Sequence, residues 1–253
     1  MTYRVPLSYN RFEVMMMKKL KKILIALIII VVLVAGGCIY YINDYYHATD
    51  RENALKDTDK VKVEKIDDGY FFDGPGTDKA LIFYPGAKVE DIAYANLLKD
   101  IAENGVDCFL IHMPANLAIL GKNRADDIME EYSYDKYYLM GHSMGGAMAA
   151  SYAEENGDKM DGLIFLAAYS AVDLSKYEFG VLSIYGNQDG VLNMEKVESG
   201  RKYMPDNYME QVIHGGNHAQ FGDYGNQKGD KDATISPKEQ QERTVEYILN
   251  FVK

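Results

Sequence analysis

The sequence predicts an α/β fold with a mostly parallel sheet and helices on both faces, preceded by one N-terminal transmembrane helix. An uncharged run of 20 residues covers 23–42 and follows a cluster of lysines. From about residue 61, short apolar runs of strand length alternate with stretches of helical spacing. Strands that are apolar along their whole length are typical of parallel sheets covered on both faces. The roughly 200 residues after the apolar run suit one domain.

The apolar run is long enough to cross a bilayer, because about 20 helical residues span the ~30 Å hydrocarbon layer. Four lysines stand just before it: Lys18, Lys19, Lys21 and Lys22. Basic residues stay on the cytoplasmic side. We therefore predict a basic cytoplasmic N-terminus over 1–22 and a signal anchor over 23–43. The protein is expected to cross the cell membrane once, with its domain on the extracytoplasmic side.

Two other readings of this segment stay open. It has the layout of a cleaved signal peptide, and Cys38 follows small residues as in an acylated lipoprotein. A polar, charged tether is expected over 44–60, followed by the domain at 61–253.

Charge excludes one class of function. The chain holds 27 Lys and Arg against 38 Asp and Glu, a formal net charge of −11. Because six of the basic residues lie within 1–22, the rest of the chain is more acidic still. Such a domain is not expected to bind nucleic acid. The two cysteines, Cys38 and Cys108, give no disulfide framework.

The expected strands follow in order, and turn residues mark several of their ends. Two short strands open the domain; Pro85 and Gly86 end the next, and Pro114 follows the fourth. Pro237 starts the closing helix, since proline is favoured in a first helical turn. The strands are expected at 61–66, 70–72, 80–84, 106–111, 137–140, 163–168, 181–185 and 208–213. The helices are expected at 90–103, within 117–132, and at 145–155, 194–203 and 237–252, with a long loop at 222–236.

The strongest local motif is Gly141-His142-Ser143-Met144-Gly145, which fits G-x-S-x-G. It follows an expected strand and precedes an expected helix, the context that a nucleophile elbow requires. Such a turn strains the serine backbone, and the flanking Gly141 and Gly145 avoid collisions. We predict that Ser143 is a nucleophile.

A serine nucleophile needs a base, and the base needs an acid that orients it. Asp189 follows the expected strand 181–185, and His218 follows 208–213. Along the chain the serine comes first, the acid second and the histidine third, as in enzymes with this elbow. His214 is the alternative base and Asp173 the alternative acid, whereas His142 belongs to the elbow itself and faces away from the position of a base.

Acyl transfer also needs donors for the oxyanion. One is normally the backbone N–H after the nucleophile, here that of Met144. The other comes from the loop after the strand 80–84, where the N–H of Ala87 is the candidate.

From about residue 80 to 252, the chain resembles the α/β-hydrolase superfamily, and within it the bacterial dienelactone-hydrolase-like branch. The resemblance is carried by FYPGAKVE, GHSMGGAMAA, LSIYGNQDG and GGNHAQFGDYG. It implies a triad of Ser143, Asp189 and His218 and an oxyanion loop at Gly86 and Ala87. The dienelactone enzymes themselves use cysteine as nucleophile, where this chain has serine.

The sequence has no zinc-type spacing of histidines and no nucleotide-binding motif, so no metal and no cofactor are expected. We expect a serine hydrolase that cleaves a small-molecule ester or related acyl substrate through an acyl-enzyme. An acyltransferase or peptidase with the same triad, or a non-catalytic binding module, remain alternatives.

Overall fold

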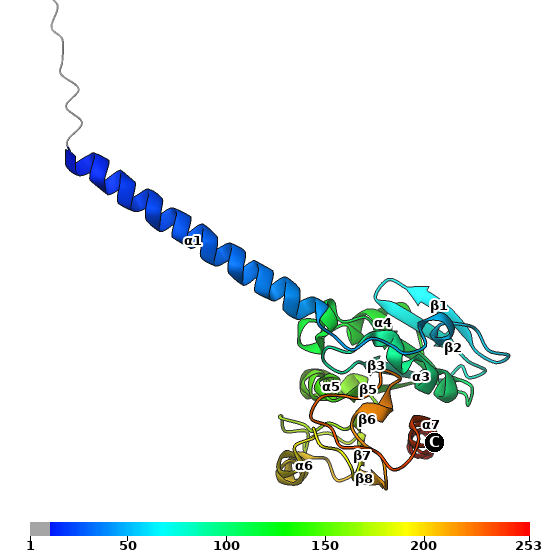
Figure 1. Cartoon of the computed structure of the whole chain (residues 1–253). Helices are drawn as coiled ribbons and strands as arrows, with labels where there is room; N and C mark the ends of the chain where they lie inside the picture. The colour runs from blue at the N-terminus through cyan, green and yellow to red at the C-terminus, as the bar shows by residue number, and fades with distance from the viewer. Residues whose placement is uncertain (1–10) are drawn as a thin grey trace, which may run out of the picture. The chain divides into compact units, whose positions relative to one another are not determined.

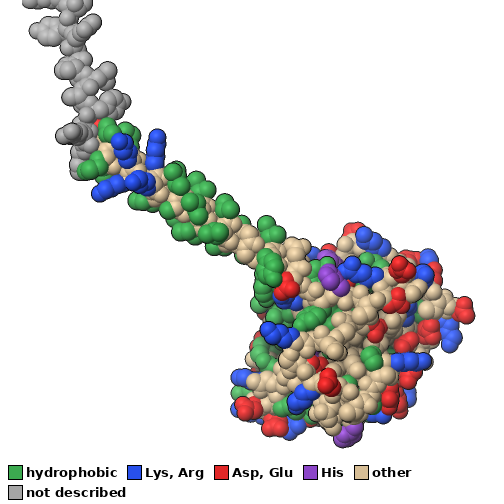
Figure 2. Space-filling model, viewed as in Figure 1, with side chains coloured by type: hydrophobic (Ala, Val, Ile, Leu, Met, Phe, Trp, Pro, Cys, Tyr) green, Lys and Arg blue, Asp and Glu red, His purple; other side chains and the backbone are tan. Residues whose placement is uncertain are grey.

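A computed structural model describes residues 11–253, and the chain divides into two compact units between Asp44 and Tyr45. Part of the predicted basic segment, including Arg4, lies outside the described residues. The first unit contains the helix α1 (Arg11–Asn43). Its candidate span, Glu13–Asn43, has a mean hydropathy of 3.1 over its most apolar window and is not buried. This is the composition of a membrane span or a signal sequence. Basic side chains gather at the N-terminal end of α1, and hydrophobic side chains cover the helix beyond them (Figure 2).

The second unit is built on one eight-stranded sheet with the order β1-β2-β4-β3-β5-β6-β7-β8 (Figure 1). Strands β3 to β8 are parallel to one another. At one edge of the sheet, β2 runs antiparallel to both of its neighbours, β1 and β4. The strands are β1 (Lys62–Ile66), β2 (Gly69–Asp73), β3 (Lys79–Tyr84), β4 (Asp107–Ile111), β5 (Lys136–His142), β6 (Gly162–Leu166), β7 (Gly180–Gly186) and β8 (Tyr208–Ile213). The prediction of a mostly parallel sheet is confirmed.

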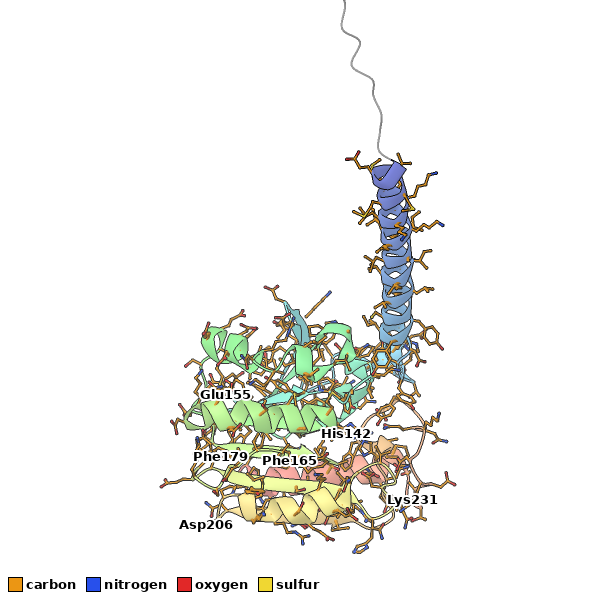
Figure 3. All side chains as sticks on the ribbon, turned by 90° about the vertical axis from the view of Figure 1, so that its left-hand side faces the viewer. His142, Glu155, Phe165, Phe179, Asp206 and Lys231 are labelled. Carbon is orange, nitrogen blue, oxygen red and sulfur yellow. The ribbon has the colours of Figure 1, made fainter. Side chains whose placement is uncertain are left out.

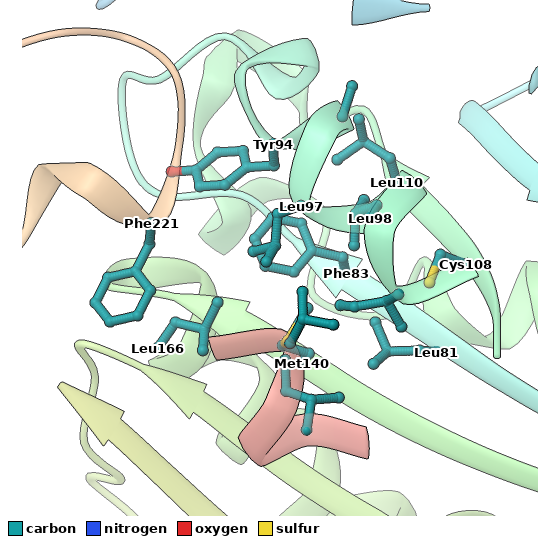
Figure 4. Close-up of a cluster of buried hydrophobic side chains, with 14 of the residues drawn as sticks. Leu81, Phe83, Tyr94, Leu97, Leu98, Cys108, Leu110, Met140, Leu166 and Phe221 are labelled. Carbon is teal, nitrogen blue, oxygen red and sulfur yellow. The ribbon is translucent and has the colours of Figure 1, made fainter. Parts of the chain in front are cut away.

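Helices cover both faces of the sheet because its strands are apolar on both sides. Alternate side chains of a strand point to opposite faces, so Leu81 and Phe83 of β3 join one buried cluster and Ile82 the other. The first cluster packs under α3 (Ala95–Ala102) and α7 (Pro237–Phe251) (Figure 4). The second packs under α4 (Ala125–Glu131) and α5 (Met144–Asn156).

Several expected helices are shorter or begin differently. The stretch 90–103 opens as the 3-10 turn η1 (Asp91–Tyr94) before α3. The turn η2 (Pro114–Asn116) precedes the stretch 117–132, which contains the turn η3 (Ala118–Leu120) and α4. The helix α6 (Met194–Gly200) ends in the turn η5 (Arg201–Tyr203). Two short turns, η4 (Gly157–Lys159) and η6 (Ala219–Phe221), carry no periodic pattern that would predict them.

The segment 44–60 is not a free tether. From Tyr45 onward it belongs to the compact domain, where Tyr46 forms a parallel bridge with Val89 and a short helix, α2 (Arg51–Ala54), follows. Ala48 and Ala54 are buried. The segment docks mainly through backbone hydrogen bonds, which leave no apolar period in the sequence. We call residues 45–54 the strap.

Candidate active site

Ser143 is the single residue between the end of β5 and the start of α5. Its backbone has φ 52° and ψ −120°, a region that a residue with a side chain occupies only when the surroundings hold it there. Pairing of β5 with β6 continues through His142, and the Ser143 N–H donates to the carbonyl of Leu166 at 2.9 Å. The chain then turns directly into α5. The backbone therefore makes a tight turn from strand to helix at Ser143.

The two elbow glycines are required by close contacts between backbones. A Cβ placed on Gly145 would lie 2.1 Å from the carbonyl oxygen of Tyr84, at the end of β3. One placed on Gly141 would lie 2.4 Å from the carbonyl carbon of Gly145. Neither contact is possible with a side chain, so Gly145 allows the elbow to lie against the end of β3 and Gly141 allows the turn to close on itself.

Asp189 and His218 form a buried pair. The Asp189 carboxylate lies 2.8 Å from Nδ1 of His218, and both side chains are almost fully buried. The other carboxylate oxygen of Asp189 accepts the N–H groups of Val191 and Leu192 at 2.8 and 2.7 Å. Both oxygens of the Asp189 carboxylate are therefore fixed by hydrogen bonds. Nε2 of His218 is buried and has no hydrogen-bond partner within residues 11–253.

Ser143 and His218 line the same pocket, which has a volume of about 390 Å³. The other lining residues come from α5, from the loop after β6 and from the loop after β7. They are Met144, Ala147, Met148, Ala167, Ala168, Tyr169, Val191, Leu192 and Asn193. The lining contains no Asp, Glu, Lys or Arg. A larger open depression of about 530 Å³, between Ile119 and Asp127, contains none of the predicted site residues.

The alternative acid and base lie elsewhere. His214 is exposed, and its Nδ1 lies 3.5 Å from Nδ2 of Asn187. Asp173 accepts both the N–H and the hydroxyl of Ser175, and these hydrogen bonds lower the pKa of its carboxyl group. Neither residue lines the pocket.

The two predicted oxyanion donors lie in different elements of the chain. Met144 is the first residue of α5 and lines the pocket. Ala87 lies in the loop after β3, whose next residue, Lys88, has φ 57° and donates its N–H to the carbonyl of Asn116 at 2.8 Å. In the part of the chain that the structure describes, no hydrogen bond uses the N–H of Ala87 or of Met144.

Sequence reasoning missed a buried chain of hydrogen bonds that joins this loop to His218. The N–H of Gly86 donates to the hydroxyl of Tyr94 at 3.2 Å, and that hydroxyl lies 2.8 Å from Nδ1 of His142. Nε2 of His142 lies 3.1 Å from the carbonyl oxygen of His218. Since a carbonyl only accepts, Nε2 of His142 carries the proton and Nδ1 accepts from Tyr94.

Burial, assisted by the nearby His218, holds the pKa of His142 well below its usual value of 6.5. The ring therefore stays neutral, as this hydrogen-bonding pattern requires. His142 lies at one end of the domain together with Lys231, while Glu155, Phe179 and Asp206 lie at the other (Figure 3). The site thus occupies the carboxyl ends of the parallel strands, where α/β sheets carry their ligands.

Asp230 is a second residue that the sequence did not indicate. One oxygen of its carboxylate accepts the N–H of Gly190 and the other accepts the N–H of Ala219, both at 2.9 Å. These two N–H groups directly follow Asp189 and His218. Asp230 thus connects the two loops that carry the buried pair, although it lies in the stretch 222–236 expected only to be a loop.

Among the described residues, no group of three or more His, Cys, Asp or Glu is arranged to hold a metal ion. The site consists of a strained serine, a buried histidine–aspartate pair and an uncharged pocket.

The sheet order, the elbow after β5 and the positions of Asp189 and His218 after β7 and β8 define an α/β-hydrolase fold. Residues 80–242 match the Alpha/beta hydrolase family, and the chain belongs to this family. A comparison with curated proteins gave no match.

Solved structures share the fold at low sequence identity. A predicted CIB-like hydrolase from Thermoplasma acidophilum is 14% identical with a TM-score of 0.57, over 76% of this chain and 98% of its own. TT1662 from Thermus thermophilus is 13% identical with a TM-score of 0.57, over 77% and 99%. Est1E from Butyrivibrio proteoclasticus is 16% identical with a TM-score of 0.52, over 76% and 99%.

Proposed function

We propose that this protein is a membrane-anchored serine hydrolase that cleaves carboxylic esters through an acyl-enzyme, with Ser143 as nucleophile. One observation carries the proposal: Ser143, at positive φ, shares a pocket with a buried histidine that is hydrogen-bonded to a buried aspartate. A purely structural serine has no need of strained geometry beside such a pair.

In this mechanism, Oγ of Ser143 bonds to the ester carbonyl carbon while its proton passes to Nε2 of His218. The carbonyl electron pair moves onto oxygen. When the carbonyl re-forms, the bond to the alcohol breaks, and the leaving oxygen takes the proton from His218. Water then repeats the two steps and releases the acid. Asp189 holds His218 with Nε2 toward the pocket and stabilises its protonated form.

The negative oxygen of the intermediate would be stabilised by the N–H groups of Met144 and Ala87. The N-terminus of α5, which begins at Met144, adds partial positive charge at the same point. No metal or cofactor takes part in these steps.

The pocket favours a small, neutral acyl group. Its walls are mainly alanine, methionine, valine and leucine side chains. A substrate with a charged acyl group would have to leave water without meeting an opposite charge, which is unfavourable. We therefore expect neutral esters to be preferred over esters of dicarboxylic acids.

The protein is expected to span the cell membrane once through α1, with its catalytic domain on the extracytoplasmic side. The basic residues before the apolar run support this orientation.

The test of the function is labelling by a fluorophosphonate together with hydrolysis of a panel of activated esters. Ser143→Ala should abolish both, with a loss on the order of 10⁶ in kcat. More than a few per cent of residual activity would remove Ser143 from its role. Wild-type protein that neither reacts with the probe nor hydrolyses any ester would indicate a binding module. Faster turnover with alcohol or amine acceptors than with water would indicate an acyltransferase.

A further inference from the structure

The strap runs beside the loop that carries Ala87. The N–H of Tyr46 donates to the carbonyl of Lys88 at 2.7 Å, and the carbonyl of Tyr46 accepts the N–H of Glu90 at 2.8 Å. Together these bonds form the parallel bridge between Tyr46 and Val89. The strap therefore adds a short strand segment to the loop that follows β3.

The side chain of Tyr46 contacts the segment of the chain that follows His218. Its hydroxyl accepts the N–H of Lys228 at 3.0 Å, and its ring lies 5.7 Å from the ring of Tyr224. The N–H of Thr49 donates to the carbonyl of Asp223 at 2.8 Å. Residues 223–228 belong to the chain that leaves His218. Tyr46 thus connects the loop of the oxyanion donor to the loop of the base.

Glu90 fastens the strap at its far end. One oxygen of its carboxylate accepts a hydrogen bond from the N–H of Ala48 at 2.8 Å. The same oxygen accepts hydrogen bonds from Nε and Nη2 of Arg51 at 2.8 and 2.7 Å. The backbone of the strap is therefore fixed to the loop both at Tyr46 and at Glu90.

We propose that Tyr46 is a positioning residue for the oxyanion loop, an inference that rests on the proposed function. Lys88 has φ 57°, which a residue with a side chain keeps only under constraint from its neighbours. Its N–H is held by Asn116 and its carbonyl by Tyr46. Ala87 lies between Gly86, held by Tyr94, and this constrained Lys88. The side chain of Tyr46 holds the strap in place through Lys228 and Tyr224. Its loss would loosen the backbone hydrogen bond from Tyr46 to the Lys88 carbonyl, free the loop and move the N–H of Ala87.

The experiment compares Tyr46→Ala with Tyr203→Ala in the full chain in detergent micelles. Tyr203 is the control because its side chain is exposed and its ring contacts Lys202 in η5, outside the strap. We measure kcat per active site, titrated with a fluorophosphonate, KM, and the affinity for a boronic acid that binds as a tetrahedral adduct. A misplaced donor weakens the transition state more than the ground state.

For Tyr46→Ala, kcat per site is expected to fall about 10- to 100-fold, with KM within about twofold. Affinity for the boronic acid should fall by the same factor as kcat. Tyr46→Phe, which keeps the ring, should restore kcat to within about threefold of wild type. Tyr203→Ala should behave as wild type. A role in folding alone would lower the number of titratable sites and leave kcat per site unchanged, and that result would overturn the proposal.

Arg51→Ala provides a second route that leaves buried side chains intact, since it releases Glu90 at the surface. It should lower kcat per site and boronic acid affinity in parallel, by about threefold or more. If Tyr46→Ala does not fold, wild-type values of both quantities in Arg51→Ala would reject the positioning role. A wild-type protein without esterase activity would instead reject the proposed function, so the two failures are distinguishable.

Discussion

At the scale of single residues, the contacts of the histidines and aspartates separate their roles. His218 is buried against Asp189 and faces the pocket, whereas His214 and Asp173 are exposed and lie outside it. We expect His218→Ala to be as damaging as Ser143→Ala, and Asp189→Asn to lower kcat by up to about 10⁴. His214→Ala and Asp173→Asn are the matched controls and should keep nearly full activity. Steady-state hydrolysis of an activated ester decides between the two sets.

Tyr94 should matter both for stability and for turnover. Tyr94→Phe leaves Gly86 without its acceptor and His142 without its donor. An unsatisfied buried polar group costs about 1–3 kcal/mol, and the loosened oxyanion loop should lower kcat about 10-fold. Tyr152→Phe is the control, because the hydroxyl of this buried tyrosine bonds Asp126 away from the site. Equal kcat in the two variants would contradict the role of Tyr94.

His142 should make the domain sensitive to acid. Its folded-state pKa lies well below 6.5, so below about pH 6.5 the unfolded chain binds a proton that the folded chain does not. The free energy of unfolding should be constant in this respect above pH 6.5 and fall by up to about 1.4 kcal/mol per pH unit below it. Urea unfolding between pH 5 and 7.5 measures this slope. His142→Gln should have a shallower slope, and an unchanged slope would assign the acid sensitivity to other groups.

The sequence locates the residues whose roles depend on local pattern. Ser143 and its two glycines form one motif, and Asp189 and His218 each follow an expected strand; the structure brings these last two within 2.8 Å. Tyr94 and Asp230 could not be found in this way. Tyr94 meets His142 across 48 positions of the chain, and Asp230 meets Gly190 across 40. Nothing near either residue marks it.

At the scale of elements, the central strands β3, β4, β6 and β7 leave the clearest signal, because they are buried along almost their whole length and read as continuous apolar runs. The edge strand β1 is also expected from the sequence, but none of its residues is buried and its signal is weaker. The strap is different. Its backbone donates and accepts hydrogen bonds, which any sequence can do, so its polar composition suggests a free tether. The onset of α3 also differs from expectation, because the first turn, η1, is wound as a 3-10 helix.

The contact between the elbow and β3 should not tolerate even one added carbon. Gly145→Ala would force Cβ against the carbonyl of Tyr84, a backbone atom that cannot move aside cheaply. We expect a loss of about 3 kcal/mol or more in stability and loss of esterase activity. Gly200→Ala, in α6, is the control, because its nearest atom is 3.7 Å away. Thermal unfolding of both variants tests this, and a stable, active Gly145→Ala protein would show that the elbow can shift.

At the scale of the whole molecule, the proposed orientation in the membrane rests on charge. Four lysines and Arg11 precede the apolar part of α1, while the chain beyond it is strongly acidic. A reporter that works only outside the cytoplasm should therefore be active when fused after Lys253. The same fusion with a reporter that works only in the cytoplasm should be silent. The reverse pattern would place the domain in the cytoplasm.

For the proposed anchored protein, the docking of the strap so soon after α1 has a consequence for proteolysis. Only Asp44 and Tyr45 separate the end of α1 from the bridge at Tyr46. A sheddase that cut within these two residues would release the domain with its strap. A cut after Arg51 would leave Tyr46 on the membrane stub. The two soluble fragments would differ by only a few residues at their N-termini, yet only the longer one would retain the contacts of Tyr46 with Lys88 and Lys228.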